Sequence, residues 1–197
     1  RRNPRDDLTT ALVNAQDGAD SLTGDELSTS VIGLFGAGFE TTAHMIGNGT
    51  YLLGVNGHQR QRLTQDIRLA ETATEEVLRY ESSLQATYRT ALEDQLVSET
   101  LIPAGDRVLT IVASANRDET VFDNPNVFDI SPREQKPLTF GGGIHYCIGA
   151  ALARLEGEIF FEELINGYPD FVVDVDAARL RKAFLFRGYE YLPVTLK

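Results

Sequence analysis

The sequence predicts a mainly α-helical protein with small β-sheets. Apolar residues recur at helical spacing over two long stretches, residues 23–54 and 147–159. Short β-branched or aromatic segments bounded by turn residues indicate strands at 85–91, 171–173 and 190–194, and residues 101–106 indicate a strand and a turn that lead into another strand at 107–112. The chain has 197 residues, of which 42% are hydrophobic and 24% are charged, so we expect one domain with its own core over residues 1–197.

Charge and cysteine content exclude several classes of protein. The formal net charge of −11 argues against nucleic acid as a partner. No run of 18 apolar residues is present, so we expect no membrane anchor. A single cysteine cannot form an internal disulfide and is typical of a reducing compartment, which predicts a cytoplasmic protein.

The first stretch should form a short helix, a loop and then a long helix. Leucine and valine residues at positions 8–13 predict the short helix, and residues 17–20 predict the loop. Thr23 and Glu26 have the spacing of a capping box, which marks the start of the long helix. This helix should run to about Gly54, and it is apolar around much of its circumference, so we expect it to be buried.

The long helix contains two features that local rules disfavour. Its interior glycines each cost about 1 kcal/mol against alanine, and either close packing or a ligand lying against the helix would explain them. Glu40 and Thr41 lie together in the apolar middle. A threonine hydroxyl bonded back to the carbonyl four residues earlier would explain that threonine without any chemistry.

Two further helices are predicted over residues 59–80. Glu76 and Arg79 are three residues apart, so they share one helix face. Taken alone, such a pair is usually solvated and contributes only tenths of a kcal/mol.

The only cysteine lies in residues 140–154, with the sequence FGGGIHYCIGAALAR, where a glycine-rich loop runs straight into a helical pattern. Cys147 precedes a helical pattern, and the free N–H groups of a helix N-terminus favour a thiolate. The glycines leave the backbone open to a flat or bulky partner. The thiolate could be a nucleophile with His145 as its base, a metal ligand, the single axial ligand of a haem, or simply a buried free cysteine. One cysteine cannot by itself hold zinc or an iron–sulfur cluster.

This loop resembles the haem-binding loop of the cytochrome P450 family, of the soluble bacterial type, and matches its pattern Phe-Gly-Gly-x-x-His-x-Cys-x-Gly-x-x-Leu-Ala-Arg at every fixed position. The resemblance implies a haem b cofactor with Cys147 as the axial iron ligand. It further implies that haem is contacted by Phe140, Gly141, His145, Gly149 and, through a propionate, Arg89.

Two other segments resemble motifs of the same family. Residues 37–42, AGFETT, resemble its oxygen-activation motif, which implies that Thr41 hydrogen-bonds dioxygen or a nearby water and that Glu40 helps to relay protons. Glu76 and Arg79 resemble its Glu-x-x-Arg pair, a buried structural triad that a later arginine completes. Arg133 is the candidate for that arginine, although Pro132 takes the position where relatives usually have it.

The resemblance covers essentially the whole chain but only the C-terminal half of a typical family member. It implies a monooxygenase that hydroxylates or epoxidises a small apolar molecule with O2 and with electrons from a separate ferredoxin or flavin reductase. The N-terminal lid half is missing, and another chain or segment could supply it. A truncated, non-catalytic haem-binding or scaffold fragment is the alternative. The residues expected to line the substrate pocket are Leu34, Ala37, Gly38, Leu84, Gln85, Leu185 and Phe186.

Overall fold

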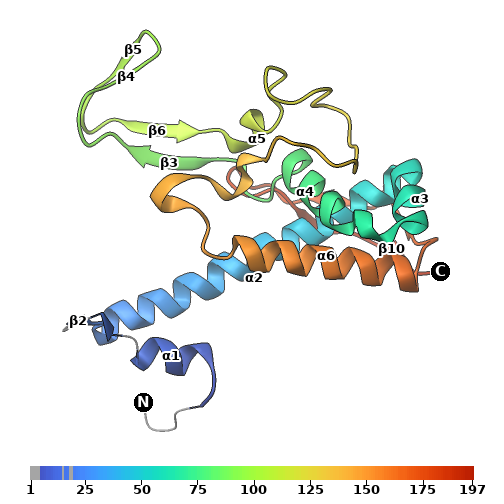
Figure 1. The fold of residues 1–197 in the computed structure, drawn as a ribbon, viewed down its shortest axis with the longest axis horizontal. Coiled ribbons are helices and arrows are strands. Elements are labelled where there is room, and N and C mark those ends of the chain that lie inside the picture. The colour runs from blue at the N-terminus through green and yellow to red at the C-terminus, as the bar shows by residue number, and fades with distance from the viewer. Residues whose placement is uncertain (1–4, 15, 18–19) are drawn as a thin grey trace. The chain divides into compact units, whose positions relative to one another are not determined.

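The computed structural model describes residues 5–14, 16–17 and 20–197 (Figure 1). The chain divides into two units, residues 1–40 and 41–197, which are described separately. One long helix, α2 (Gly24–Val55), supplies residues to both units.

The first unit contains a short helix, a β-hairpin and the start of α2. Helix α1 covers Leu8–Asn14, and strands β1 (Gln16–Asp17) and β2 (Asp20–Ser21) pair antiparallel. The middle of the predicted loop, residues 18–19, lies outside the described residues. The predicted capping box is confirmed. The Thr23 hydroxyl accepts a hydrogen bond from the Glu26 N–H at 3.2 Å, and the Glu26 carboxylate accepts one from the Thr23 N–H at 2.9 Å.

The second unit contains the end of α2 and the remaining helices. The two helices predicted over residues 59–80 are confirmed as α3 (Gly57–Gln65) and α4 (Ala70–Tyr80). Further along lie α5 (Val112–Ala115) and α6 (Ala150–Gly167). Three short 3-10 helices join them: η1 (Ile67–Leu69), η2 (Leu138–Phe140) and η3 (Gly143–His145).

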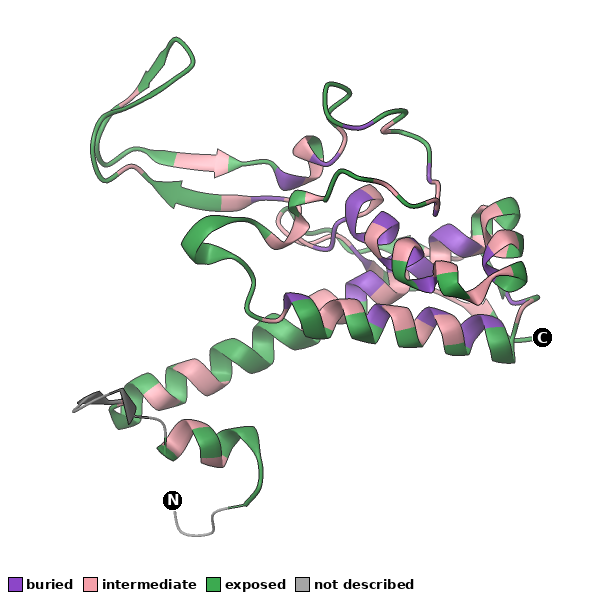
Figure 2. Ribbon diagram, viewed as in Figure 1, coloured by how far each residue is buried: buried purple, intermediate pink, exposed green. Residues whose placement is uncertain are grey.

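The core of the second unit lies where α2, α4 and α6 pack together (Figure 2). Glycines make the close approach of these helices possible. A Cβ added at Gly49 of α2 would lie 2.1 Å from the Phe161 ring, and one added at Gly157 of α6 would lie 2.5 Å from the Thr74 methyl group. Close packing, the first of the two explanations for the glycines of α2, therefore accounts for Gly49. The fully buried apolar residues include Leu53, Leu63, Val77, Ile130, Phe161 and Phe171.

The expectation that α2 is buried along its length is wrong. The buried residues of α2 begin at His44, and residues 24–40 include none. Ile32, Phe35 and Phe39 are 72%, 74% and 70% exposed. The other described elements of the first unit are a helix of seven residues and two strands of two residues each. These elements are too short to cover an apolar face of α2.

The second unit also contains four two-stranded antiparallel sheets. They pair β3 (Thr87–Thr90) with β6 (Arg107–Thr110), β4 (Gln95–Val97) with β5 (Thr100–Ile102), β7 (Val172–Val173) with β10 (Val194–Thr195), and β8 (Arg179–Leu180) with β9 (Tyr189–Tyr191).

Some strand predictions need correction. The single strand expected over residues 190–194 is two strands in different sheets, and Pro193, which has no N–H to donate, separates them. Strands β4 and β8 were not predicted, because each is short and exposed and so lacks a core-facing apolar pattern. Among the described residues, no helix is long and apolar enough to cross a membrane.

Candidate functional site

The loop that presents Cys147 is built from 3-10 turns and glycines in conformations that other residues rarely adopt. Gly141 has φ 69° and Gly143 has φ 63°, both in the left-handed region. The loop is closed where the Cys147 N–H donates to the Phe140 carbonyl at 3.0 Å. Helix α6 begins three residues after the cysteine, and the Ala150 N–H donates to the Cys147 carbonyl at 3.2 Å. The sequence therefore holds the thiol close to the positive end of a helix dipole.

The thiol is presented on an open side of the loop. Residues 141–148 are all exposed, including Cys147, and the side chain of Ile144 is 97% exposed. Within the described part of the chain, no cluster of three or more His, Cys, Asp and Glu side chains could hold a metal ion. A single exposed thiol fits a planar metal complex that takes only one ligand from the protein, as haem does when a cysteine thiolate is its axial ligand. It does not fit a tetrahedral zinc site.

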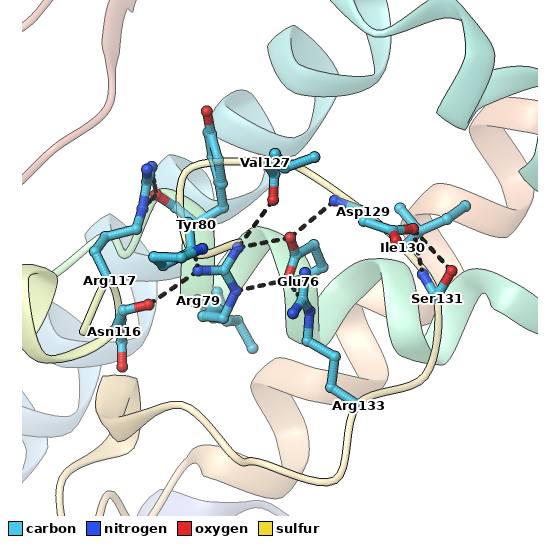
Figure 3. A network of polar contacts seen from close by, with 12 residues as sticks. Glu76, Arg79, Tyr80, Asn116, Arg117, Val127, Asp129, Ile130, Ser131 and Arg133 are labelled. Carbon is cyan, nitrogen blue, oxygen red and sulfur yellow. Dashed lines mark hydrogen bonds and ion pairs between the residues drawn. The ribbon is translucent and has the colours of Figure 1, made fainter. Parts of the chain in front are cut away.

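The buried pair predicted on α4 is the centre of a polar network (Figure 3). Arg79 donates two hydrogen bonds to the Glu76 carboxylate, at 2.7 and 2.8 Å, and both side chains are almost fully buried. The remaining Arg79 donors bond the carbonyls of Asn116, Pro125 and Val127 at 2.8–3.2 Å. The pair is therefore a structural centre rather than the solvated pair that its spacing alone suggests.

The third arginine also reaches this centre. Arg133 Nε lies 3.4 Å from Glu76 Oε2, and its Nη1 donates to the Asp123 carbonyl at 3.0 Å. The Asp129 N–H donates to the other Glu76 oxygen at 2.9 Å. The network thus fixes the irregular segment between α5 and η2 against α4.

Asn116 connects this network to the cysteine loop, and the sequence reasoning missed it. Its carbonyl accepts from Arg79, while its side chain donates to the Thr139 hydroxyl at 2.9 Å and accepts from the Leu138 N–H at 2.7 Å. Thr139 in turn donates to the Leu78 carbonyl at 2.7 Å. An asparagine followed by charged residues is common in surface turns, so nothing in the local sequence distinguishes this fully buried one.

Four of the predicted pocket residues are brought together by the backbone. The Gln85 N–H donates to the Leu185 carbonyl at 2.8 Å, and Leu84 forms an isolated antiparallel bridge with Phe186. All four are half-buried. Asn48 of α2 bonds the backbone beside this contact on both segments. Its side-chain amide donates to the carbonyl of Glu81, which follows α4, and to that of Arg187, each at 3.0 Å.

The other predicted site residues occupy different elements. His145 ends η3 and is exposed, and Gly149 precedes the first residue of α6. Arg89 is exposed on β3, where its Nη1 donates to the Tyr88 carbonyl at 2.8 Å. Its role at a haem propionate stays a prediction.

The predicted oxygen-activation pair lies where the two units divide. Glu40 is the last residue of the first unit and Thr41 the first of the second, both within α2. The next residue, Thr42, donates to Glu156 of α6 at 3.2 Å. Leu34, Ala37 and Gly38 lie in the first unit, so their assignment to a pocket stays a prediction.

Fold and site together define a protein with one cysteine thiol presented by a glycine loop at the start of a helix, braced by a buried glutamate–arginine network. The chain belongs to the cytochrome P450 family, whose profile matches residues 1–174. It is 39% identical over 199 residues to the polyketide biosynthesis cytochrome P450 PksS of Bacillus subtilis, covering 100% of this chain and 49% of that protein.

Solved structures agree with this assignment and confirm the predicted fold class. The tirandamycin C-bound P450 monooxygenase TamI superposes with a TM-score of 0.93 at 43% identity, covering 100% of this chain and 50% of that one. P450BioI, in complex with an acyl carrier protein ligated to hexadec-9Z-enoic acid, gives a TM-score of 0.93 at 39% identity, covering 100% and 50%. The chain thus spans about half the length of the relatives that it matches.

Proposed function

We propose that the chain is the iron-ligating, C-terminal half of a haem-thiolate monooxygenase, with Cys147 as the axial ligand of haem b. The observation that supports this most directly is the loop geometry, in which one thiol at the start of α6 stands exposed beside left-handed glycines. When bound, haem would supply oxygen activation, which a cysteine thiolate favours by pushing electron density toward O–O cleavage. Phe140, Gly141, His145 and Gly149 would contact it.

The residues of this chain would then transfer protons and position the haem. The Thr41 hydroxyl would donate a hydrogen bond to O2 or to a water beside it, and Glu40 would exchange protons with solvent. Arg89 would bind a haem propionate, because its guanidinium fork suits a carboxylate. The network of Glu76, Arg79 and Arg133 would keep the cysteine loop in place without taking part in the chemistry.

We propose a small, mostly apolar substrate. Leu84, Leu185 and Phe186 meet at the contact between two segments about a hundred residues apart, and their apolar side chains support this class of ligand. The names of the relatives agree with it: PksS is a polyketide biosynthesis protein, and TamI was solved with tirandamycin C. The reaction would be hydroxylation or epoxidation.

The reaction needs partners that this chain does not supply. Electrons would come from a ferredoxin or a flavin reductase in the cytoplasm. An N-terminal half would close the haem pocket, and the exposed apolar residues of α6 support its presence. Leu152, Leu155 and Ile159 of that helix are 59%, 51% and 49% exposed. A non-catalytic haem-binding fragment is the second candidate, since the exposed cysteine loop alone leaves the thiol open to water.

The test is the reduced, carbon-monoxide difference spectrum of the chain supplied with haem. A thiolate-type band that Cys147→Ser abolishes and His145→Ala retains would support iron ligation by Cys147. A band that survives in Cys147→Ser would overturn the proposal. A thiolate band without hydroxylation of apolar probes, when reductase is present, would select the non-catalytic candidate.

A further inference from the structure

Arg154, in the second turn of α6, contacts the cysteine loop, residues 140–147, near both of its ends. Its Nη1 donates to the Tyr146 hydroxyl at 3.0 Å, directly before Cys147. Its guanidinium carbon lies 4.5 Å from the centre of the Phe140 ring, at the start of the loop. Its Nε forms an ion pair with Glu75 of α4. The Arg154 guanidinium therefore connects α4 and α6 to Phe140, where the loop begins, and to Tyr146, close to where it ends.

Few other contacts could fix the thiol in this way. The eight residues 141–148 are exposed, so burial does not hold them. The backbone bond from Cys147 to Phe140 closes the loop but does not fix it against the helices. Asn116 and Thr139 secure only the segment before the loop. The Ala150 N–H of α6 bonds the Cys147 carbonyl, and the contacts of Arg154 to Tyr146 and Phe140 add a side-chain link between the exposed loop and the packed pair α4–α6.

We infer that Arg154 is a positioning residue for the Cys147 thiol, and that the Tyr146 hydroxyl is the contact through which it acts. A planar guanidinium can donate to Glu75 with one edge, donate to Tyr146 with another and stack on Phe140 with its face. A lysine ammonium cannot make these three contacts at once. The inference depends on the proposed function in one respect only, namely that the group which the positioned thiol would bind is haem.

The first measurement is amide hydrogen exchange of the chain without haem, so that it does not depend on the proposed function. Tyr146→Phe removes one hydrogen bond and keeps the ring, and Arg154→Lys keeps the charge. Each should speed exchange within residues 140–149 by about two- to fivefold, the size expected for loss of a solvent-exposed contact to a charged group. Exchange in the centre of α4 should not change. The double variant should exchange no faster than the faster single variant, because both substitutions break the same contact.

A matched control separates positioning from general stability. Arg62 pairs with Asp129 at 2.8 Å and is 31% exposed in its side chain, against 30% for Arg154, but it lies far along the chain from the loop. Arg62→Lys should leave exchange within residues 140–149 as it is. Unchanged loop exchange in both Tyr146→Phe and Arg154→Lys would overturn the inference, and so would an equal rise in Arg62→Lys.

The second measurement is spectroscopic. After addition of haem and carbon monoxide, the thiolate-type fraction of the band should fall in Arg154→Lys and Tyr146→Phe and stay at the wild-type level in Arg62→Lys. If the wild-type chain itself gives no thiolate band, the proposed function fails, while the exchange experiment still decides whether Arg154 holds the loop. An undiminished thiolate fraction in both loop variants would contradict a positioning role.

Discussion

Replacing Arg79 by methionine tests the polar network most directly. Methionine keeps much of the volume and length of the side chain but none of its donors. The change would leave the Glu76 carboxylate, 3% exposed, without the guanidinium that donates two hydrogen bonds to it. It would also remove the donors of three carbonyls, those of Asn116, Pro125 and Val127.

The expected loss of stability is large. Removing one partner of a buried ion pair costs about 3–5 kcal/mol, because the other charge stays buried. Each buried carbonyl that stays unpaired costs about 1–3 kcal/mol more, less whatever water can repair. We expect the free energy of unfolding to fall by at least about 3 kcal/mol, a large part of the 5–15 kcal/mol typical of a domain.

The assay is urea unfolding followed by circular dichroism, with a double-mutant cycle as its control. Glu76→Gln together with Arg79→Met removes the uncompensated charge, so the double variant should lose at least about 2 kcal/mol less than the sum of the two single losses. The ion pair of Arg133 with Glu76, 3.4 Å apart in the wild type, is kept in two of the four proteins and lost in the other two, so its own contribution cancels in the cycle. A loss below about 1 kcal/mol in Arg79→Met, or simple additivity, would refute the reasoning.

Two further predictions concern packing and pH. Gly49→Ala should destabilise the chain by about 1–3 kcal/mol, because its Cβ would overlap the buried Phe161 ring, whereas Gly47→Ala, whose Cβ meets no described atom within 4 Å, should stabilise it by up to about 1 kcal/mol. Unfolding by urea measures both, and equal effects would contradict the packing argument. Burial alone would raise the pKa of Asp129, but hydrogen bonds from Ser131 and the Arg62 guanidinium outweigh it and hold that pKa below its usual 3.8. A lowered pKa gives stability that is present above the unfolded value and lost as pH falls through the folded one. The stability difference between wild type and Asp129→Asn should therefore shrink on acidification below pH 3.8, and a constant difference would be the contrary result.

The sequence allowed the most reliable predictions where the signal is local. The capping box of Thr23 and Glu26 depends on two side chains three residues apart, and the structure has it as expected. The helix after Cys147 follows from apolar spacing, and α6 confirms it. The burial of Glu76 and Arg79 could not come from their spacing, because a surface pair has the same spacing, and only the resemblance to the family predicted it.

The sequence did not predict the contacts between residues that lie far apart along the chain. Asn116 lies 22 residues before Leu138 and 37 after Arg79, and it bonds both. Arg154 joins Glu75, 79 residues earlier, to the residue before the cysteine. Both residues are of types that commonly lie on the surface, so their roles depend on tertiary geometry, which no local pattern encodes.

Helix α6 shows why an apolar stripe identifies a helix better than it identifies a core. The stripe that predicted this helix, Ile148, Leu152, Leu155 and Ile159, is 49–89% exposed. The buried residues of this helix are others, among them Gly157, which lies against Thr74 of α4, and Phe161, which lies against Gly49 of α2. A helix that is apolar on two sides is typical of one buried between two layers. The residues that the structure describes cover one apolar side of α6, so the stripe that made the helix predictable is exposed on the other side.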